Sequence, residues 1–235
     1  MKIFSKKRII FMAIFLLMVF AGNRINFAPV IGMDNQFFTL FQFFGPIAGA
    51  FLGPVYGVLV VLLAELGDFL LVSKTWSLIN LVRLTPMLFA AYYFGKNRMN
   101  VSAIVPLAAM AMFILHPVGR QAWFFSLYWL IPVAVKILQS KYSNLYLRSL
   151  GATFTAHAVG SVAWLYTVPM DAGQWTGLIP IVAFERLLFA AGIAGSFYAV
   201  NIALDWLSHR VRIPADLLHI DRRYLLSGKV VVQRV

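Results

Sequence analysis

Long apolar runs recur along this chain from Ile9 to Leu207, separated by short polar, proline or glycine breaks. Each run is long enough, or nearly so, to cross a hydrocarbon core of roughly 30 Å. Only 12% of the 235 residues are charged, so the chain lacks the charged surface of a soluble domain of this size. The sequence therefore predicts an all-α fold, a polytopic transmembrane helical bundle of about six to eight spans. The eight candidate spans are residues 9–22, 37–52, 55–72, 77–95, 101–116, 121–138, 149–168 and 177–207.

The basic residues indicate how such a bundle lies in the cell membrane. If eight crossings start in the cytoplasm, both termini are cytoplasmic and 15 of the 20 Lys and Arg residues lie on the inner side. That bias is the one that the positive-inside rule describes. Six full crossings with one hairpin of partial helices would preserve it. The three basic residues expected on the outer side are Arg24, Lys74 and Arg120.

We expect residues 1–207 to form a single transmembrane domain and residues 208–235 to form a basic cytoplasmic tail. The tail mixes basic and apolar residues, which suits contact with the anionic inner leaflet or with a cytoplasmic partner. A short ordered tail with solvated charges is the simpler alternative. The first apolar run follows a basic segment and also has the form of a signal peptide with a weak cleavage site, although an uncleaved first helix fits the orientation.

Glycine stands at every fourth position in the second apolar run and the start of the third, as Gly45, Gly49, Gly53 and Gly57. In lipid, small residues four apart let helix backbones approach closely. The four glycines therefore predict a contact between helices, either inside this bundle or with a partner.

Polar residues at matching depths predict a site within the bundle. Glu65 and Asp68 lie in one apolar run, Asn80 and Arg83 lie in the next, and a short loop around residues 73–76 joins the two runs. Each pair is three residues apart and shares a helix face. Counting inward from the loop gives Asp68 and Asn80 one depth, and Glu65 and Arg83 a greater depth. The geometry permits a Glu65–Arg83 ion pair, which either contacts a ligand or only locks two helices together.

The last two spans extend this polar layer. Glu185 and Arg186 are adjacent and point about 100° apart on a helix, so we expect Glu185 to face the bundle and Arg186 to meet a neighbouring helix or carbonyl. His157 belongs to a helical stripe from Thr153 to Trp164 that would line a cavity, although a lone histidine in a helix is more often a hydrogen-bonded packing residue. Ionisable residues inside a membrane span are candidates for function because burying them is costly. The candidate substrate-binding residues are Glu65, Asp68, Asn80, Arg83, His157, Glu185 and Arg186.

The motifs that the chain lacks exclude several function classes. It has no cysteine, no Walker A sequence and no HExxH or GxSxG motif, and its four histidines are not spaced as metal ligands. We therefore expect no metal and no cofactor. The net charge of +12 comes from basic residues that cluster at the ends of apolar runs, so we expect these charges to meet a lipid bilayer and not nucleic acid.

The chain resembles the substrate-binding S components of energy-coupling factor (ECF) transporters, mainly in residues 39–71, TLFQFFGPIAGAFLGPVYGVLVVLLAELGDFLL. The likeness consists of a proline in the apolar helix, a Gly-Pro break and a glycine-rich helix that ends in an acid, Asp68. It continues more weakly through GATFTAHAVGSVAWLY and LIPIVAFERLLFA. The resemblance implies a vitamin-like or metabolite-binding membrane protein that docks to a membrane coupling subunit driven by two cytoplasmic ATPases. The chain departs from the family in its span count and in lacking an Ala-x-x-x-Ala motif in residues 9–22.

The leading hypothesis is a non-enzymatic transport protein, an outward-facing substrate-capture subunit with Glu65, Arg83 and Glu185 as its principal ligands. The mixed charge favours a zwitterionic or hydrogen-bonding substrate over a simple anion. One alternative is a membrane-embedded enzyme acting on a lipid or isoprenoid, with His157 and Glu185 as acid and base. Another is a structural subunit of a larger membrane complex, whose charges meet other subunits.

Overall fold

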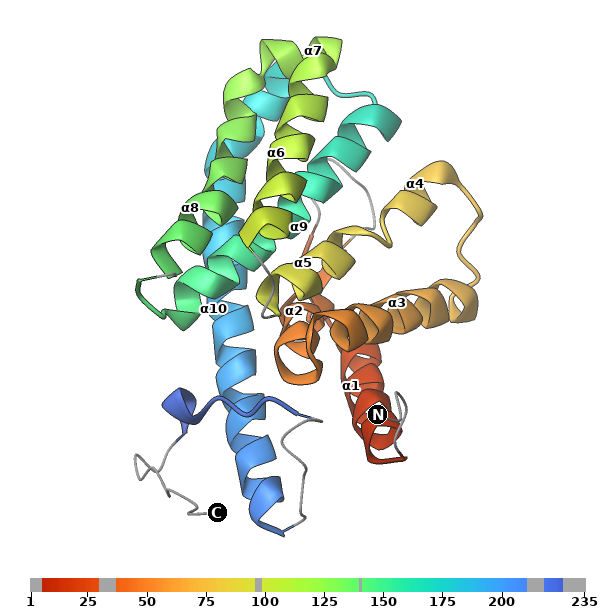
Figure 1. Ribbon diagram of the computed structural model, residues 1–235. Coiled ribbons are helices and arrows are strands. Elements are labelled where there is room, and N and C mark those ends of the chain that lie inside the picture. The colour runs from red at the N-terminus through yellow and green to blue at the C-terminus, as the bar shows by residue number, and fades with distance from the viewer. Residues whose placement is uncertain (1–5, 30–36, 96–98, 140, 211–217, 226–235) are drawn as a thin grey trace.

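The computed structural model describes residues 6–29, 37–95, 99–139, 141–210 and 218–225. It is mostly helical, and the all-α class predicted from the apolar runs is confirmed (Figure 1). A small antiparallel sheet that the sequence did not predict pairs β1 (Asn26–Pro29) with β2 (Phe37–Thr39). The helices are α1 (Lys6–Gly22), α2 (Phe41–Leu52), α3 (Pro54–Leu71), α4 (Leu78–Val82), α5 (Pro86–Phe94), α6 (Met99–Leu115), α7 (Pro117–Gln121), the 3₁₀-helix η1 (Trp123–Trp129), α8 (Leu130–Gln139), α9 (Leu145–Thr167), α10 (Ala172–Arg210) and the 3₁₀-helix η2 (Arg222–Tyr224).

Two helices in the described part of the chain, α3 and α10, are long and apolar enough to cross a membrane. The other apolar helical segments have 10–17 residues. The helices also differ in direction, because α6, α8 and α10 run along the molecule in Figure 1 whereas α3 runs across it. The eight predicted runs therefore do not fold as eight uniform helices.

The predicted span 77–95 is wrong as a single helix. It divides into α4 and α5, with Arg83 at the carboxyl end of α4 and Pro86 at the start of α5. Proline lacks an N–H group and so cannot donate the backbone hydrogen bond that a continuous helix would require at Pro86. The Thr85 hydroxyl donates a hydrogen bond to the carbonyl of Val82 at 2.8 Å and closes the broken end. The break leaves Arg83 at a helix terminus, away from a regular helix face.

The four glycines spaced four residues apart, which we call the glycine ladder, lie at the crossing of α2, α3 and α5. They are Gly45, Gly49, Gly53 and Gly57. A Cβ atom on Gly49 would stand 1.9 Å from the carbonyl oxygen of Ala91, and one on Gly57 would stand 2.4 Å from the Cα atom of Gly49. Gly45 lies against Met87 of α5, also within this chain. Gly53 serves differently, because its φ of +84° permits the sharp break between α2 and α3. The described contacts of Gly45, Gly49 and Gly57 are thus internal, and leave no glycine face there for a partner.

Two apolar clusters form the interior of the described chain. One gathers buried residues of α1, α2, α3, α5 and the carboxyl half of α10, including Phe15, Phe51 and Phe197. The other gathers residues of α6, η1 and the amino-terminal part of α10, including Phe113 and Trp129. The helix α9 contributes to both clusters, and together with α10 it joins them.

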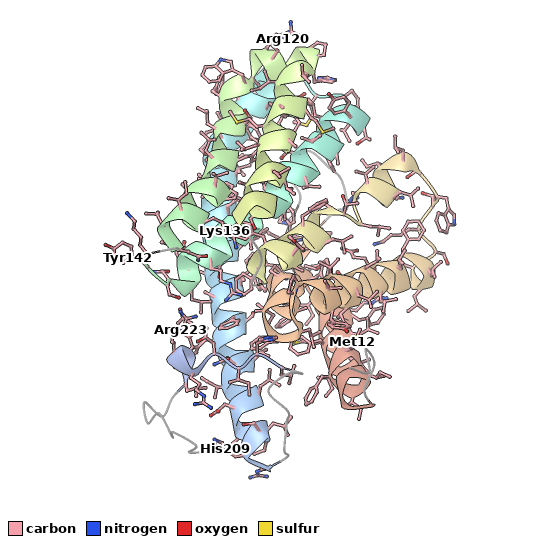
Figure 2. The ribbon with its side chains drawn as sticks, in the orientation of Figure 1. Met12, Arg120, Lys136, Tyr142, His209 and Arg223 are labelled. Carbon is pink, nitrogen blue, oxygen red and sulfur yellow. The ribbon has the colours of Figure 1, made fainter. Side chains whose placement is uncertain are left out.

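Two cations that were expected on the inner side are used to cap α5. Lys136 of α8 donates to the carbonyl of Tyr93 at 3.2 Å, and Arg148 of α9 donates to the carbonyl of Phe94 (Lys136 is marked in Figure 2). The last carbonyls of a helix lack partners within the helix and carry partial negative charge, so cations stabilise them. The carboxyl end of α5 is thereby fixed to the two helices that pack beside it.

Residues 218–225, which we call the strap, pack across α10 and the end of α2. The buried side chain of Asn201 donates to the carbonyls of Asp221 and Tyr224 at 2.9 and 3.0 Å and accepts from the Asp221 N–H at 2.8 Å. The backbone N–H of His219 donates to the carbonyl of Phe51 at 2.9 Å. The strap is therefore an ordered, hydrogen-bonded part of the fold.

Charged side chains reinforce the strap. Arg223 donates to both carboxylate oxygens of Asp221 and also to the Ser143 hydroxyl. The Arg223 side chain holds the pKa of Asp221 below its ordinary value of 3.8, so this contact is complete at neutral pH. Arg223 and His209 lie toward the end of the molecule where α1 begins and α10 ends, and Arg120 lies at the opposite end (Figure 2).

We expect Gly49→Ala to lower the free energy of unfolding by about 1–3 kcal/mol, since the added methyl group overlaps the Ala91 carbonyl. Gly195→Ala on α10 is the matched control, because nothing lies within 4 Å of a Cβ atom there. That control should be neutral or more stable by up to about 1 kcal/mol. Thermal unfolding of the two detergent-solubilised variants measures the difference, and equal melting temperatures would contradict the close helix crossing.

We expect Asn201→Leu to release the strap, because it leaves one N–H and two carbonyl groups of the strap without their partner. Hydrogen–deuterium exchange in residues 218–225 should accelerate by an amount that corresponds to about 2–3 kcal/mol of lost protection. Asn201→Asp keeps an acceptor for the Asp221 N–H and should have an intermediate effect. Unchanged exchange in Asn201→Leu would show that the strap is held by other contacts.

Candidate functional site

All seven residues predicted to bind substrate line one cavity of about 890 Å³. Residues from β2, α2, α3, α4, α5, η1, α9 and α10 contribute to its walls. Three of the chain's eight acids and four cations are among the lining residues, so the cavity carries mixed charge with a formal sum of +4 − 3 = +1. The charged lining residues are Arg24, Glu65, Asp68, Lys74, Arg83, Glu185 and Arg186.

Asp68 joins two loops at one edge of the cavity. Its carboxylate lies 3.2 Å from the guanidinium of Arg24 and 2.7 Å from the ammonium of Lys74, and its side chain is 9% exposed. Arg24 precedes β1 and Lys74 follows α3, so the buried acid holds the start of the sheet against the end of α3. Asn80, expected beside Asp68, instead donates to the carbonyl and hydroxyl of Thr75 at 3.0 and 3.2 Å.

Glu65 and Arg83 line the same cavity but do not form the predicted ion pair. In the described part of the chain, neither side chain makes a hydrogen bond or an ion pair, although their charges act on each other electrostatically. Both residues are half-buried. The break before Pro86 accounts for the difference, because Arg83 sits at the end of α4 and not on the continuous helix from which the pairing was derived. Two opposite charges therefore face one cavity without neutralising each other directly.

Glu185 and Arg186 contact each other, contrary to the expectation that they serve separate contacts. Arg186 Nη2 lies 3.3 Å from Glu185 Oε2, and Arg186 Nη1 donates to the Thr153 hydroxyl at 3.3 Å. The guanidinium also lies over the rings of Phe189 and Phe38, at 4.4 and 5.3 Å from their centroids. The Cα–Cβ bonds of the two residues point about 100° apart on the helix. The long Arg186 side chain nevertheless folds back and reaches the Glu185 carboxylate. Arg186 is 4% exposed, and its Nε–H group has no hydrogen-bond partner among the described residues.

His157 is held on both sides of its ring. The indole N–H of Trp129 donates to His157 Nδ1 at 3.2 Å, and Ser161 Oγ lies 3.2 Å from His157 Nε2. An indole nitrogen can only donate, so Nδ1 carries no proton and the neutral ring carries its proton on Nε2. His157 thus lines the cavity as a hydrogen-bonded residue with a fixed tautomer, in a setting of aromatic neighbours such as Phe125 and Phe154.

An aromatic wall lies beside the charged residues. Trp175 packs edge-on against Phe113 and Phe125, with ring centroids 5.1 and 5.0 Å apart, and it is 2% exposed. Its indole N–H group has no hydrogen-bond partner in residues that the structure describes. Trp164, whose indole donates to the Met170 sulfur at 3.2 Å, also lines the cavity. A flat apolar group could therefore be accommodated next to the charges.

From the sequence we also expect a set of residues near the outer mouth to close over the site, namely Asp34, Asn35, Gln42, Trp76, Arg120, Trp123 and Trp175. The structure gives these residues different positions. Gln42 and Trp175 line the cavity, whereas Trp76 packs on Phe69 with centroids 4.7 Å apart. The remaining expected mouth residues are divided: Arg120 and Trp123 are not cavity residues, and Asp34 and Asn35 lie outside the described residues.

Sequence reasoning missed several lining residues. Arg24 and Lys74 were counted only as outer-side basic residues, yet both bind Asp68. Arg24 and Lys74 are two of the three basic residues expected on the outer side, where the positive-inside rule predicts few. Their unusual location could have marked them as candidates for a specific contact. Within the described ranges, no cluster of three His, Asp or Glu side chains could hold a metal ion.

Comparisons with known proteins give a distant likeness. An uncharacterized protein of Methanocaldococcus jannaschii is 25% identical over 204 residues, which cover 78% of this chain and 68% of that protein. No protein family matches the chain, and no solved structure matches it.

We expect Asp68→Asn to loosen the edge of the cavity, because a neutral amide cannot neutralise Arg24 and Lys74. Hydrogen exchange in β1 should accelerate by an amount that corresponds to about 1–3 kcal/mol, the usual range for hydrogen bonds to charged groups. Asp205→Asn, which removes the acid beside His209, is the control and should leave β1 unchanged. If β1 exchanges equally in Asp68→Asn and the wild type, Asp68 does not anchor the sheet.

Proposed function

We propose that this chain is a multi-pass integral membrane protein of the cell membrane that captures a small polar, vitamin-like metabolite from the outer side. The observation that carries the proposal is the cavity of about 890 Å³, into which the predicted polar residues converge. Binding sites for small molecules typically have volumes of about 300–1,000 Å³ and combine apolar walls with a few polar groups. The cavity has both features, with charges beside an aromatic wall.

Membrane insertion is supported by the two helices of spanning length and by the shorter apolar helices around them. Large apolar side chains are exposed along the helices, including Ile14 and Leu17 of α1, Leu107 of α6 and Phe184 of α10. Lipid is the environment in which such surfaces are stable. The proposed topology has six to eight crossings, some of them by partial helices, with both termini in the cytoplasm. The beginning of α1 and the end of α10 at one end of the molecule agree with this topology (Figure 1).

In this proposal, transport is energised by a membrane coupling subunit and cytoplasmic ATPases, as the resemblance to ECF S components implies. Because Gly45, Gly49 and Gly57 are occupied by internal contacts, the glycine ladder does not provide the docking face. Co-purification of ATPase subunits with the tagged protein from its native membrane tests this part.

The environment of His157 and Glu185 favours binding over catalysis as the proposed role. A general acid or base must reach a proton of the substrate. Both His157 ring nitrogens already have partners, and Glu185 contacts Arg186. We therefore propose a non-enzymatic role, with these two residues shaping the cavity.

We expect a small molecule to remain bound when the protein is purified gently and analysed by native mass spectrometry. Gly160→Leu should abolish that adduct, because Gly160 lines the cavity and a leucine there would fill part of it. Gly195→Leu on α10 adds the same side chain where a Cβ atom meets nothing within 4 Å, so it should retain the adduct. A wild-type protein without any adduct, or an adduct that Gly160→Leu retains equally, would count against capture in this cavity.

A further inference from the structure

The charges of the cavity divide into those that are already neutralised and those that are not. Asp68 is neutralised by Arg24 and Lys74, and Glu185 by Arg186. Among the charged lining residues that the structure describes, Glu65 and Arg83 form neither an ion pair nor a hydrogen bond. One carboxyl group and one guanidinium group without a direct partner are thus available to a ligand in the same cavity.

Unneutralised charges in a partly buried cavity are costly, and a ligand that neutralises both recovers the cost. A simple anion would neutralise Arg83 but be repelled by Glu65, and a simple cation would meet the reverse problem. A neutral ligand would leave both charges uncompensated. A ligand that carries both an ammonium and a carboxylate group satisfies both side chains at once.

A second, independent observation concerns hydrogen-bond donors. The Trp175 indole N–H and the Arg186 Nε–H groups are buried and have no partner among the described residues, and both side chains line the cavity. Buried donors are nearly always hydrogen-bonded. A ligand that presents acceptor atoms beside the aromatic wall would supply what these two groups lack.

Together these observations assign a chemical class to the ligand of the proposed capture function, on which this inference rests. We infer that the cavity binds the zwitterionic headgroup of an α-amino acid with an aromatic side chain that carries a hydrogen-bond acceptor. Glu65 receives the ammonium group, Arg83 receives the carboxylate, and the aromatic side chain lies against the wall formed by Trp175. Asp68 and Glu185 remain paired within the protein when the ligand binds.

The test uses the full-length protein in nanodiscs and measures binding of tyrosine, 5-hydroxytryptophan and histidine, whose side chains each carry an acceptor, by isothermal titration calorimetry. For tyrosine, two analogues each remove one charge: tyramine lacks the carboxylate, and 3-(4-hydroxyphenyl)propionate lacks the ammonium group. At least one of the three amino acids should bind, and the matching analogues should bind at least about tenfold more weakly.

Two nearly isosteric variants assign the groups. Glu65→Gln should weaken binding of the amino acid, so that this variant binds the amino acid and the analogue without the ammonium group with equal affinity. Arg83→Gln should bind the amino acid and the analogue without the carboxylate with equal affinity. Asp205→Asn and Arg120→Gln are charge-matched controls outside the cavity and should bind like the wild type. Size-exclusion profiles verify that each variant is folded.

Failure of all three amino acids to bind would overturn the inference, as would binding that is equal for the amino acid and both analogues. If the purified protein nevertheless retains a different small molecule that Gly160→Leu loses, the capture function stands and only the ligand class is wrong. If no small molecule is retained or bound, the capture function fails as well.

Discussion

The close approach of α2 to α3 and α5 is the contact on which the cavity depends. Gly49 presents bare backbone to the Ala91 carbonyl and to Gly57, so three helices meet at a distance that a single methyl group would prevent. The positive φ of Gly53 then turns the chain sharply into α3. Because α3 leaves this crossing at a fixed angle, its carboxyl half carries Glu65 and Asp68 to the cavity wall. The cavity is therefore a consequence of backbone packing some distance from it.

The helix α10 connects the cavity to the opposite part of the fold. It carries Glu185 and Arg186 in the cavity wall and, 16 residues later, Asn201 beneath the strap. At 1.5 Å per residue, these positions are about 24 Å apart along one continuous helix. The cavity wall and the anchor of the strap therefore lie on the same helix. The strap also contacts the end of α2 through His219 and Phe51, close to the glycine crossing.

The sequence was sufficient to predict the helical class and to select residues that the fold brings together. The four residues selected by counting inward from the loop line one cavity, although α4 packs against α9 and not along α3. The individual pairings were not predictable, because each depends on something other than depth. Pro86 removes Arg83 from a continuous helix, the Arg186 side chain folds back on Glu185, and Arg24 reaches Asp68 from a segment 44 residues away. The small sheet was also missed, since its strands are only 4 and 3 residues long.

The distribution of charge in the cavity argues that the polar layer does more than hold helices together. A layer that served only as a lock would be most stable with every acid paired, since ion pairs gain strength where water is excluded. Asp68 has two cationic partners and Glu185 has one, but Glu65 has none at bonding distance among the residues that the structure describes, although Arg83 lines the same cavity. Glu65 and Arg83 face one cavity without a direct partner among the described residues, which leaves both side chains available to a ligand that binds between them. The paired acids build the cavity, and the unpaired residues are left for recognition.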